Sequence, residues 1–326
     1  MGAPSASGEH HTNPLTQPPR HATLTGVPDP SAVLIDGPWS HRDVRAGGYR
    51  FHVAEAGSGP LVLLLHGFPE FWWSWRHQLT GLAEDGLRAA APDLRGYGAS
   101  DKPPRGYDLP TLAADAAGLI TSLGERDAVL VGHGWGGLIA WTVAALHPEV
   151  VRRLVVISAP HPLRLRRRAA RMGPQTRALG HAAAFQLPWR PERHLVADEG
   201  AYVGELLHAW SGPGWPDEQS EHRYREAVQI PGVAHCSVEY YRWAVRSLIR
   251  PDGARYARRM KTRVQAPTLQ IHGALDTCAL PAVARGSEQY VAGHYEWREL
   301  ADVGHFPHAE APGLVTTELM HWCKTD

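Results

Sequence analysis

Cysteine, net charge and long apolar runs are all scarce in this sequence of 326 residues. The three cysteines (Cys236, Cys278 and Cys323) are too few, and odd in number, for a disulfide framework, so we expect free thiols and a cytoplasmic protein. The formal net charge of zero gives no indication of nucleic acid or a membrane as a partner. The longest aliphatic run, residues 61–65, is too short to span a membrane, and we find no apolar segment suited to a signal peptide near the N-terminus.

Strand-like and helix-like segments alternate through residues 31–162. Before them, residues 1–30 are rich in Pro, Ser, Thr and His and are predicted to form a flexible tail, in which His10 and His11 are solvated and bind no metal. A hairpin is expected around residues 47–48, strands at 61–65, 87–91, 128–131 and 154–157, and helices at 72–85, 111–123 and 138–145. This alternation predicts a mostly parallel sheet with helices on both faces.

The alternation stops for about a hundred residues after residue 162. Residues 163–263 are helical in pattern, rich in aromatic side chains and broken by prolines, and we interpret them as an inserted helical cap. Six arginines lie between residues 164 and 177, and a solvated helix face is favoured there over a site for an anion. Strands at 268–271 and 295–300 and a helix at 312–323 then complete the second part of the core, residues 264–326.

The stretch 128–145 predicts a nucleophile elbow, which is a strand, a sharp turn and a helix. The small residues Gly132, Gly136 and Gly137 allow the strand and the helix to pack closely, and the apex of the turn is Gly134. A nucleophile is expected at the apex, and glycine has no side chain with which to attack. Because the apex of an elbow has a positive φ, where other residues cost about 1–3 kcal/mol, Gly134→Asp is predicted to lower thermal stability while restoring chemistry.

A histidine and an acid follow the elbow in the chain order that such sites use. His305 lies on the loop after a predicted strand and is the candidate base, and Asp276, just past the preceding strand, is the candidate acid that orients it. Two neighbours are rivals: His308 is expected to point outward and to be structural, and Asp302 to lie on a surface loop.

Backbone amides supply the predicted oxyanion hole. The candidates are the amide of Trp135, next to the apex, and the amide of Phe68, in the loop after the strand at 61–65. A cis peptide is expected before Pro69 in the same loop.

Four motifs of the chain resemble those of the soluble epoxide hydrolases of the α/β-hydrolase superfamily, and the resemblance extends from about Trp39 to the C-terminus. They are His-Gly-Phe-Pro-Glu-Phe-Trp-Trp-Ser-Trp-Arg (66–76), Asp-Leu-Arg-Gly-Tyr-Gly-Ala-Ser-Asp-Lys-Pro (93–103), Gly-His-Gly-Trp-Gly-Gly (132–137) and Gly-His-Phe-Pro-His (304–308). The resemblance implies an α/β-hydrolase fold with a cap and hydrolysis of an epoxide to a vicinal diol. In that family an Asp at the elbow forms an alkyl-enzyme ester, which water activated by a His–Asp pair then hydrolyses.

The resemblance also assigns two cap residues that hydrogen-bond the epoxide oxygen. Tyr241 matches the second of the family's two cap tyrosines, whereas His181 stands where the first is expected, four residues before the Phe185-Gln186 pair. An imidazole can donate a hydrogen bond, so we interpret His181 as a substitute for that tyrosine, and an ordinary histidine on a helix surface is the alternative. The chain therefore departs from the family at two positions, Gly134 and His181.

Three functions stay open at this point. The chain is an epoxide hydrolase whose covalent route is impaired, or it is a catalyst in which His305 and Asp276 act without a covalent step, by direct water attack, rearrangement or elimination, or it is an inactive ligand-binding protein. In each case we expect a small hydrophobic ligand, such as an aromatic or alicyclic epoxide, and no metal or other cofactor. A homodimer is an open alternative to a monomer.

Overall fold

An eight-stranded sheet forms the centre of the protein in a computed structural model that describes residues 1–2, 27–171 and 173–324. The strand order is β1-β2-β4-β3-β5-β6-β7-β8, in which β1 and β2, and β2 and β4, are antiparallel and all other pairs are parallel. The strands are β1 Ser40–Ala46, β2 Tyr49–Ala56, β3 Leu61–Leu65, β4 Arg88–Pro92, β5 Ala128–His133, β6 Val151–Ile157, β7 Thr268–Gly273 and β8 Tyr295–Leu300. The predicted mostly parallel sheet is confirmed, and so is the hairpin.

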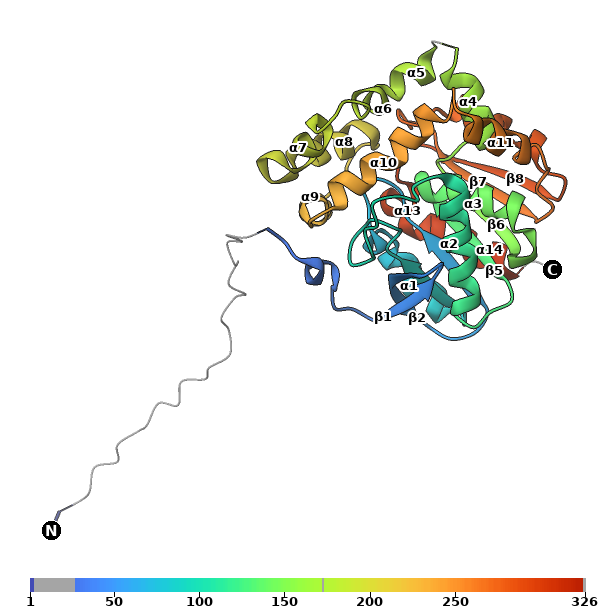
Figure 1. Ribbon diagram of the computed structural model, residues 1–326. Coiled ribbons are helices and arrows are strands. Elements are labelled where there is room, and N and C mark those ends of the chain that lie inside the picture. Colours follow the sequence, from blue (N-terminus) through green and yellow to red (C-terminus); the bar gives the residue numbers. More distant parts are fainter. Residues whose placement is uncertain (3–26, 172, 325–326) are drawn as a thin grey trace.

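Helices cover both faces of this sheet. The helices before the insertion are η1 Pro30–Val33, η2 Trp72–Trp75, α1 Arg76–Glu84, α2 Leu109–Ser122, α3 Trp135–Leu146 and η3 Pro148–Val150. Those after it are α12 Pro281–Ala284, η5 Arg285–Tyr290, α13 Pro307–Glu310 and α14 Pro312–Lys324. Helices α2 and α3 pack against each other, as do α1 and α14 (Figure 1). The helix expected at 72–85 is divided into η2 and α1.

The central strands are buried on both faces because they lie between these helical layers. Every residue of β3 is buried, and Leu63 pairs with Ala90 of β4 and with Leu130 of β5. Since β3, β5, β6, β7 and β8 are parallel, their carboxyl ends meet at one edge of the sheet, which is where sites in such folds form.

The described residues between β6 and β7 include a run of helices that is gathered at one end of the sheet (Figure 1). They are α4 Pro162–Ala169, α5 Pro174–Ala178, α6 Gly180–Ala184, α7 Arg190–Val196, η4 Ala197–Gly200, α8 Ala201–Trp210, α9 Glu218–Gln229, α10 Val233–Arg246 and α11 Pro251–Arg259. These helices lie in the segment predicted as a cap, and the boundaries of that cap at 163 and 263 stay a prediction. Among residues 27–171 and 173–324, no helix has both the length and the apolar character that crossing a membrane requires.

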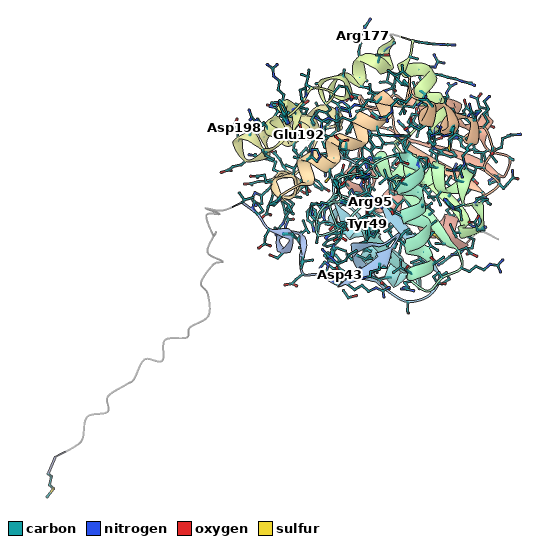
Figure 2. All side chains as sticks on the ribbon, viewed as in Figure 1. Asp43, Tyr49, Arg95, Arg177, Glu192 and Asp198 are labelled. Carbon is teal, nitrogen blue, oxygen red and sulfur yellow. The ribbon has the colours of Figure 1, made fainter. Side chains whose placement is uncertain are left out.

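Helix α10 is tied to the core through the loop after β4. The Tyr240 hydroxyl donates to the carbonyl of Arg95 at 2.7 Å, and the Arg95 guanidinium donates two hydrogen bonds to Asp115 of α2. Arg95 also lies over the ring of Tyr49, 4.2 Å from its centroid (Figure 2). These buried contacts hold α10 over the carboxyl edge of the sheet.

Two features of the sequence remain to be placed, the N-terminal tail and the arginines of residues 164–177. Most of the predicted flexible tail, residues 3–26 with both of its adjacent histidines, lies outside the described residues. The arginines of 164–177 divide into two kinds: Arg164 and Arg166 donate to Val283 and Ser247, whereas Arg177 is exposed at the edge of the molecule (Figure 2).

Candidate active site

The turn between β5 and α3 is as sharp as the sequence predicts. Gly134 has φ 51° and ψ −114°, and its amide donates to the carbonyl of Ile157 at 3.0 Å. A Cβ added to Gly132 would lie 2.2 Å from the carbonyl oxygen of Gly136, so the strand and the helix can approach this closely only with glycine there. The turn therefore presents Gly134 at the carboxyl edge of the sheet.

The surroundings of Gly134 have room for a side chain. A Cβ built on Gly134 would lie 3.6 Å from Cα of Gly67 and 3.6 Å from Nε2 of His305, which are ordinary van der Waals distances. A side chain at this position would thus begin beside the histidine that the sequence identifies as the candidate base. Glycine is favoured over other residue types at position 134 because of the positive φ and not because space is lacking.

His305 and Asp276 meet at the same edge. His305 Nδ1 lies 2.8 Å from Asp276 Oδ2, and the His305 amide donates to the carbonyl of Trp210 at 2.8 Å. Because the ionised carboxylate can only accept, Nδ1 carries the proton and Nε2 is left as an acceptor that faces Gly134. The imidazole is thereby oriented to take a proton at Nε2.

The charge of Asp276 is held by several donors. Its Oδ1 accepts from the amides of Cys278 and Ala279, both at 2.8 Å, and its Oδ2 lies 3.1 Å from Nε2 of His272. Burial alone would raise the pKa of Asp276, but the charge of His305 and the hydrogen bonds from His272 and His305 outweigh it, so the pKa is lowered. The carboxylate is ionised at neutral pH, while the rival Asp302 is exposed, as predicted.

The two amides proposed for an oxyanion hole are free to donate. Trp135 is the first residue of α3, and Phe68 precedes Pro69 in the loop after β3, with a cis peptide between them as expected. Within the part of the chain that the structure describes, neither amide has an acceptor. Their role as oxyanion donors stays a prediction.

A cavity of about 160 Å³ opens between Gly134 and the inserted helices. Its walls are mostly apolar, and its polar lining includes His181, Tyr241 and His305. The ring of Tyr241 lies edge-on to those of Trp135 and Phe68, at centroid distances of 5.1 and 5.4 Å. Burial raises the pKa of Tyr241 well above its usual value, so its hydroxyl keeps its proton and can donate.

His181 belongs to this cavity. Its side chain is 9% exposed, its ring lies 5.2 Å from that of Tyr241, and its Nε2 is buried with no partner among the described residues. The alternative of an ordinary surface histidine is therefore wrong. Burial, with a smaller contribution from the charge of His305, lowers the pKa of His181 to about 4, so this imidazole is neutral at pH 7.

A buried network behind the elbow has no local signature in the sequence. Glu70 accepts from the amide of Gly67 at 2.9 Å, and its carboxylate lies 2.6 Å from His133 Nδ1 and 2.9 Å from His308 Nε2. His133 Nε2 in turn lies 2.8 Å from the carbonyl oxygen of His305. One carboxylate thus joins the three loops that carry Phe68, Gly134 and His305.

The contacts of this network set its protonation. Because His133 faces a carboxylate with one nitrogen and a carbonyl with the other, both nitrogens carry protons and no lone pair is left for a metal ion. Burial opposes this charge, but Glu70 raises the pKa of His133. His308 is fully buried and lies over Trp75, so the expectation that it points outward is wrong, and burial lowers its pKa to about 4.

Ser158 is a further residue that the sequence did not indicate. It follows β6 directly, has φ 50°, is 1% exposed and lines the same cavity as Gly134. Its Oγ is buried and has no hydrogen-bond partner among the described residues. A buried hydroxyl of this kind loses free energy unless a ligand or water satisfies it.

Comparisons with known proteins agree with this architecture. The model of the α/β hydrolase fold family matches residues 60–312. The chain is 44% identical over 292 residues to epoxide hydrolase 3 of Xenopus tropicalis, covering 87% of this chain and 77% of the relative. It is 32% identical over 286 residues to the AB hydrolase superfamily protein YfhM of Bacillus subtilis, covering 86% and 96%. An epoxide hydrolase structure from an endophytic Streptomyces has a TM-score of 0.78 at 30% identity, covering 88% of this chain and 96% of that chain.

Proposed function

Because this chain belongs to the α/β hydrolase fold family and has epoxide hydrolases among its relatives, we propose that its cavity binds a hydrophobic epoxide and converts it to a vicinal diol. One observation carries the proposal: His305, fixed by Asp276 at 2.8 Å, turns its free Nε2 toward Gly134 beneath the cavity that contains Tyr241. The mostly apolar walls favour an aromatic or alicyclic substrate.

The covalent route of the relatives' family requires a carboxylate at the elbow, and Gly134 has none. We propose instead that His305 Nε2 takes a proton from a water molecule whose oxygen attacks an epoxide carbon directly. The ring C–O bond breaks as the new C–O bond forms, and the ring oxygen receives the proton of the Tyr241 hydroxyl. The protonated His305, stabilised by Asp276, then returns a proton to the tyrosinate through water.

Two cavity residues have the hydrogen atoms that this step needs. The Tyr241 hydroxyl is protonated at neutral pH because its burial raises the pKa. His181 is neutral, and its Nδ1 shares a hydrogen bond with the backbone of Ala178. The tautomer with its proton on Nε2 can hydrogen-bond the same ring oxygen, at the cost of that backbone bond. In this proposal Tyr241 and His181 have the role that two cap tyrosines have in the soluble epoxide hydrolases, which is to hydrogen-bond the epoxide oxygen.

The test compares the purified protein with its Gly134→Asp and His305→Ala variants on a panel of aryl and alkyl epoxides, with chromatography of the diols. We expect Gly134→Asp to turn over fastest, the glycine protein to be slower, and His305→Ala to fall to the uncatalysed rate. If neither the protein nor Gly134→Asp makes a diol from any epoxide, the proposal is wrong. In that case His305 and Asp276 act on another substrate, such as one with an acidic C–H, or the cavity only binds.

A further inference from the structure

The elbow has hydrogen-bond donors that the direct attack of water on an epoxide does not use. The amides of Phe68 and Trp135 have no acceptor among the described residues, and the buried Oγ of Ser158 has no partner there either. In the ester route such amides stabilise the oxyanion that forms on a carboxyl group, and Gly134 provides no carboxyl group. The chain therefore has a place for a carboxylate without containing one.

We propose that this place binds a small carboxylate from solution, of the size of formate, and that the bound carboxylate opens the epoxide. The inference rests on the proposed function, because it assigns a second substrate to the same cavity. The site consists of the elbow at Gly134, the two free amides and Ser158, with His305 beside it. The aspartate expected at position 134 carries the same functional group, a carboxylate.

The space at Gly134 limits the size of the anion. An aspartate there would place its Cβ 3.6 Å from Gly67 Cα and from His305 Nε2, with its carboxyl group one bond further into the cavity. Formate is the smallest carboxylate and comes nearest to that position, although without a covalent link its carbon must keep van der Waals distance from Gly134 Cα. Acetate has to move further outward, because its methyl group must keep that distance as well. We therefore expect formate to act better than acetate, and acetate better than propionate.

The charges around the elbow are compatible with an anion. The cavity lining includes the cationic side chain of Arg166, which donates to Ser247 Oγ at 2.7 Å, and His305 becomes positive when it takes a proton. The negative charge of Asp276 lies behind His305 and is stabilised by the hydrogen bonds that it accepts. Tyr241 and His181 are uncharged at neutral pH. The amide dipoles at the start of α3 also favour a negative charge.

The chemistry of the step balances. A carboxylate oxygen of formate forms a bond to an epoxide carbon, the ring C–O bond breaks, and the ring oxygen takes the proton of Tyr241, which gives a hydroxyalkyl formate. Water that has lost a proton to His305 Nε2 then attacks the formyl carbon, and the amides of Phe68 and Trp135 stabilise the oxyanion. Cleavage of the acyl C–O bond releases the diol, whose new hydroxyl takes the proton of the formic acid, and regenerates formate. The protonated His305 returns its proton to the Tyr241 phenolate through water, so formate is a catalyst in the complete cycle.

The experiment uses the glycine protein with an excess of an aryl epoxide in sodium formate, with sodium chloride at the same ionic strength as the control. We expect formate to raise the rate of epoxide consumption saturably by at least about tenfold, which corresponds to a barrier about 1.4 kcal/mol lower. With ¹⁸O-labelled formate in ordinary water, each diol molecule should receive one labelled oxygen. Acceleration without this label would show that formate acts as a base or a salt, and would overturn the inference.

Two variants separate this inference from the proposed function. Gly134→Ala places a methyl group at the elbow and should abolish the formate effect, with circular dichroism and a melting curve to show that the variant folds. If Gly134→Ala folds and responds to formate like the parent protein, formate binds elsewhere and the inference is wrong. Gly134→Asp needs no formate: if it makes diol while formate leaves the glycine protein unchanged, the inference fails and the proposed function stands. If Gly134→Asp is also inactive, both fail.

Discussion

Replacing Gly134 by aspartate should make the protein less stable although the new side chain fits. The backbone at Gly134 has φ 51° and ψ −114°, which costs a residue with a Cβ about 1–3 kcal/mol. A chain of 326 residues loses about 0.7 kcal/mol of stability per degree near its midpoint, since the unfolding entropy is about 2.1 cal/mol/K per residue. The strain therefore corresponds to a decrease in Tm of about 1–4 °C.

Differential scanning calorimetry of the protein, Gly134→Asp and Gly134→Ala at pH 7.5 measures this strain. Alanine adds only the Cβ, which meets its neighbours at 3.6 Å without a clash, so its Tm reports the backbone cost alone. Aspartate adds a buried charge that the free amides only partly compensate, so its decrease in Tm should be at least as large as that of alanine. A Gly134→Asp variant that melts at the same or a higher temperature contradicts the prediction. The same result for Gly134→Ala refutes the account of a strained elbow.

Three further outcomes follow from the buried titratable groups. Glu70→Gln leaves the charge of His133 unpaired and should lower the free energy of unfolding by about 3–5 kcal/mol in urea titrations, where an unchanged midpoint would contradict the network. Burial, aided by the charge of Arg167, lowers the pKa of His161 from 6.5 to about 3, so the unfolded chain binds more protons and stability falls as the pH drops from about 6.5 to 3. His161→Phe should flatten that pH dependence, and an unaltered slope would count against it. Tyr241→Phe, made in the Gly134→Asp background, should lower kcat about a hundredfold, and full activity would exclude Tyr241 as the acid.

The sheet could be predicted from the sequence because each of its strands is marked by a short local pattern of residues. Residues 61–65 and 128–131 are short apolar runs bounded by Gly, Pro and charged residues, and both are strands in the structure. The helix of the elbow was predicted to begin at residue 138, but α3 begins at Trp135. Gly136 and Gly137 have low helix propensity, and their close packing against neighbouring strands, which the sequence does not display, is what favours helix there.

The candidate catalytic residues could be predicted from the sequence, but the buried residues that hold them in position could not. Chain order identified His305 and Asp276, because each lies in the loop that follows a strand of a parallel sheet whose carboxyl ends meet. Glu70 and His308 are 238 residues apart and share no pattern, so only the folded chain shows that they bond. His308 was expected to point outward by helical spacing, but α13 spans only Pro307–Glu310 and turns this side chain toward the core.

The central claim is that His305 directs water onto the epoxide without an ester intermediate. A single turnover with excess glycine protein in ¹⁸O-labelled water, free of added carboxylate, tests it most directly. The account predicts that the diol of this first turnover contains one labelled oxygen, whereas Gly134→Asp, which transfers an oxygen of its own carboxylate, should give unlabelled diol in the same experiment. Unlabelled diol from the glycine protein would show that a protein group attacks the epoxide, and would contradict the claim.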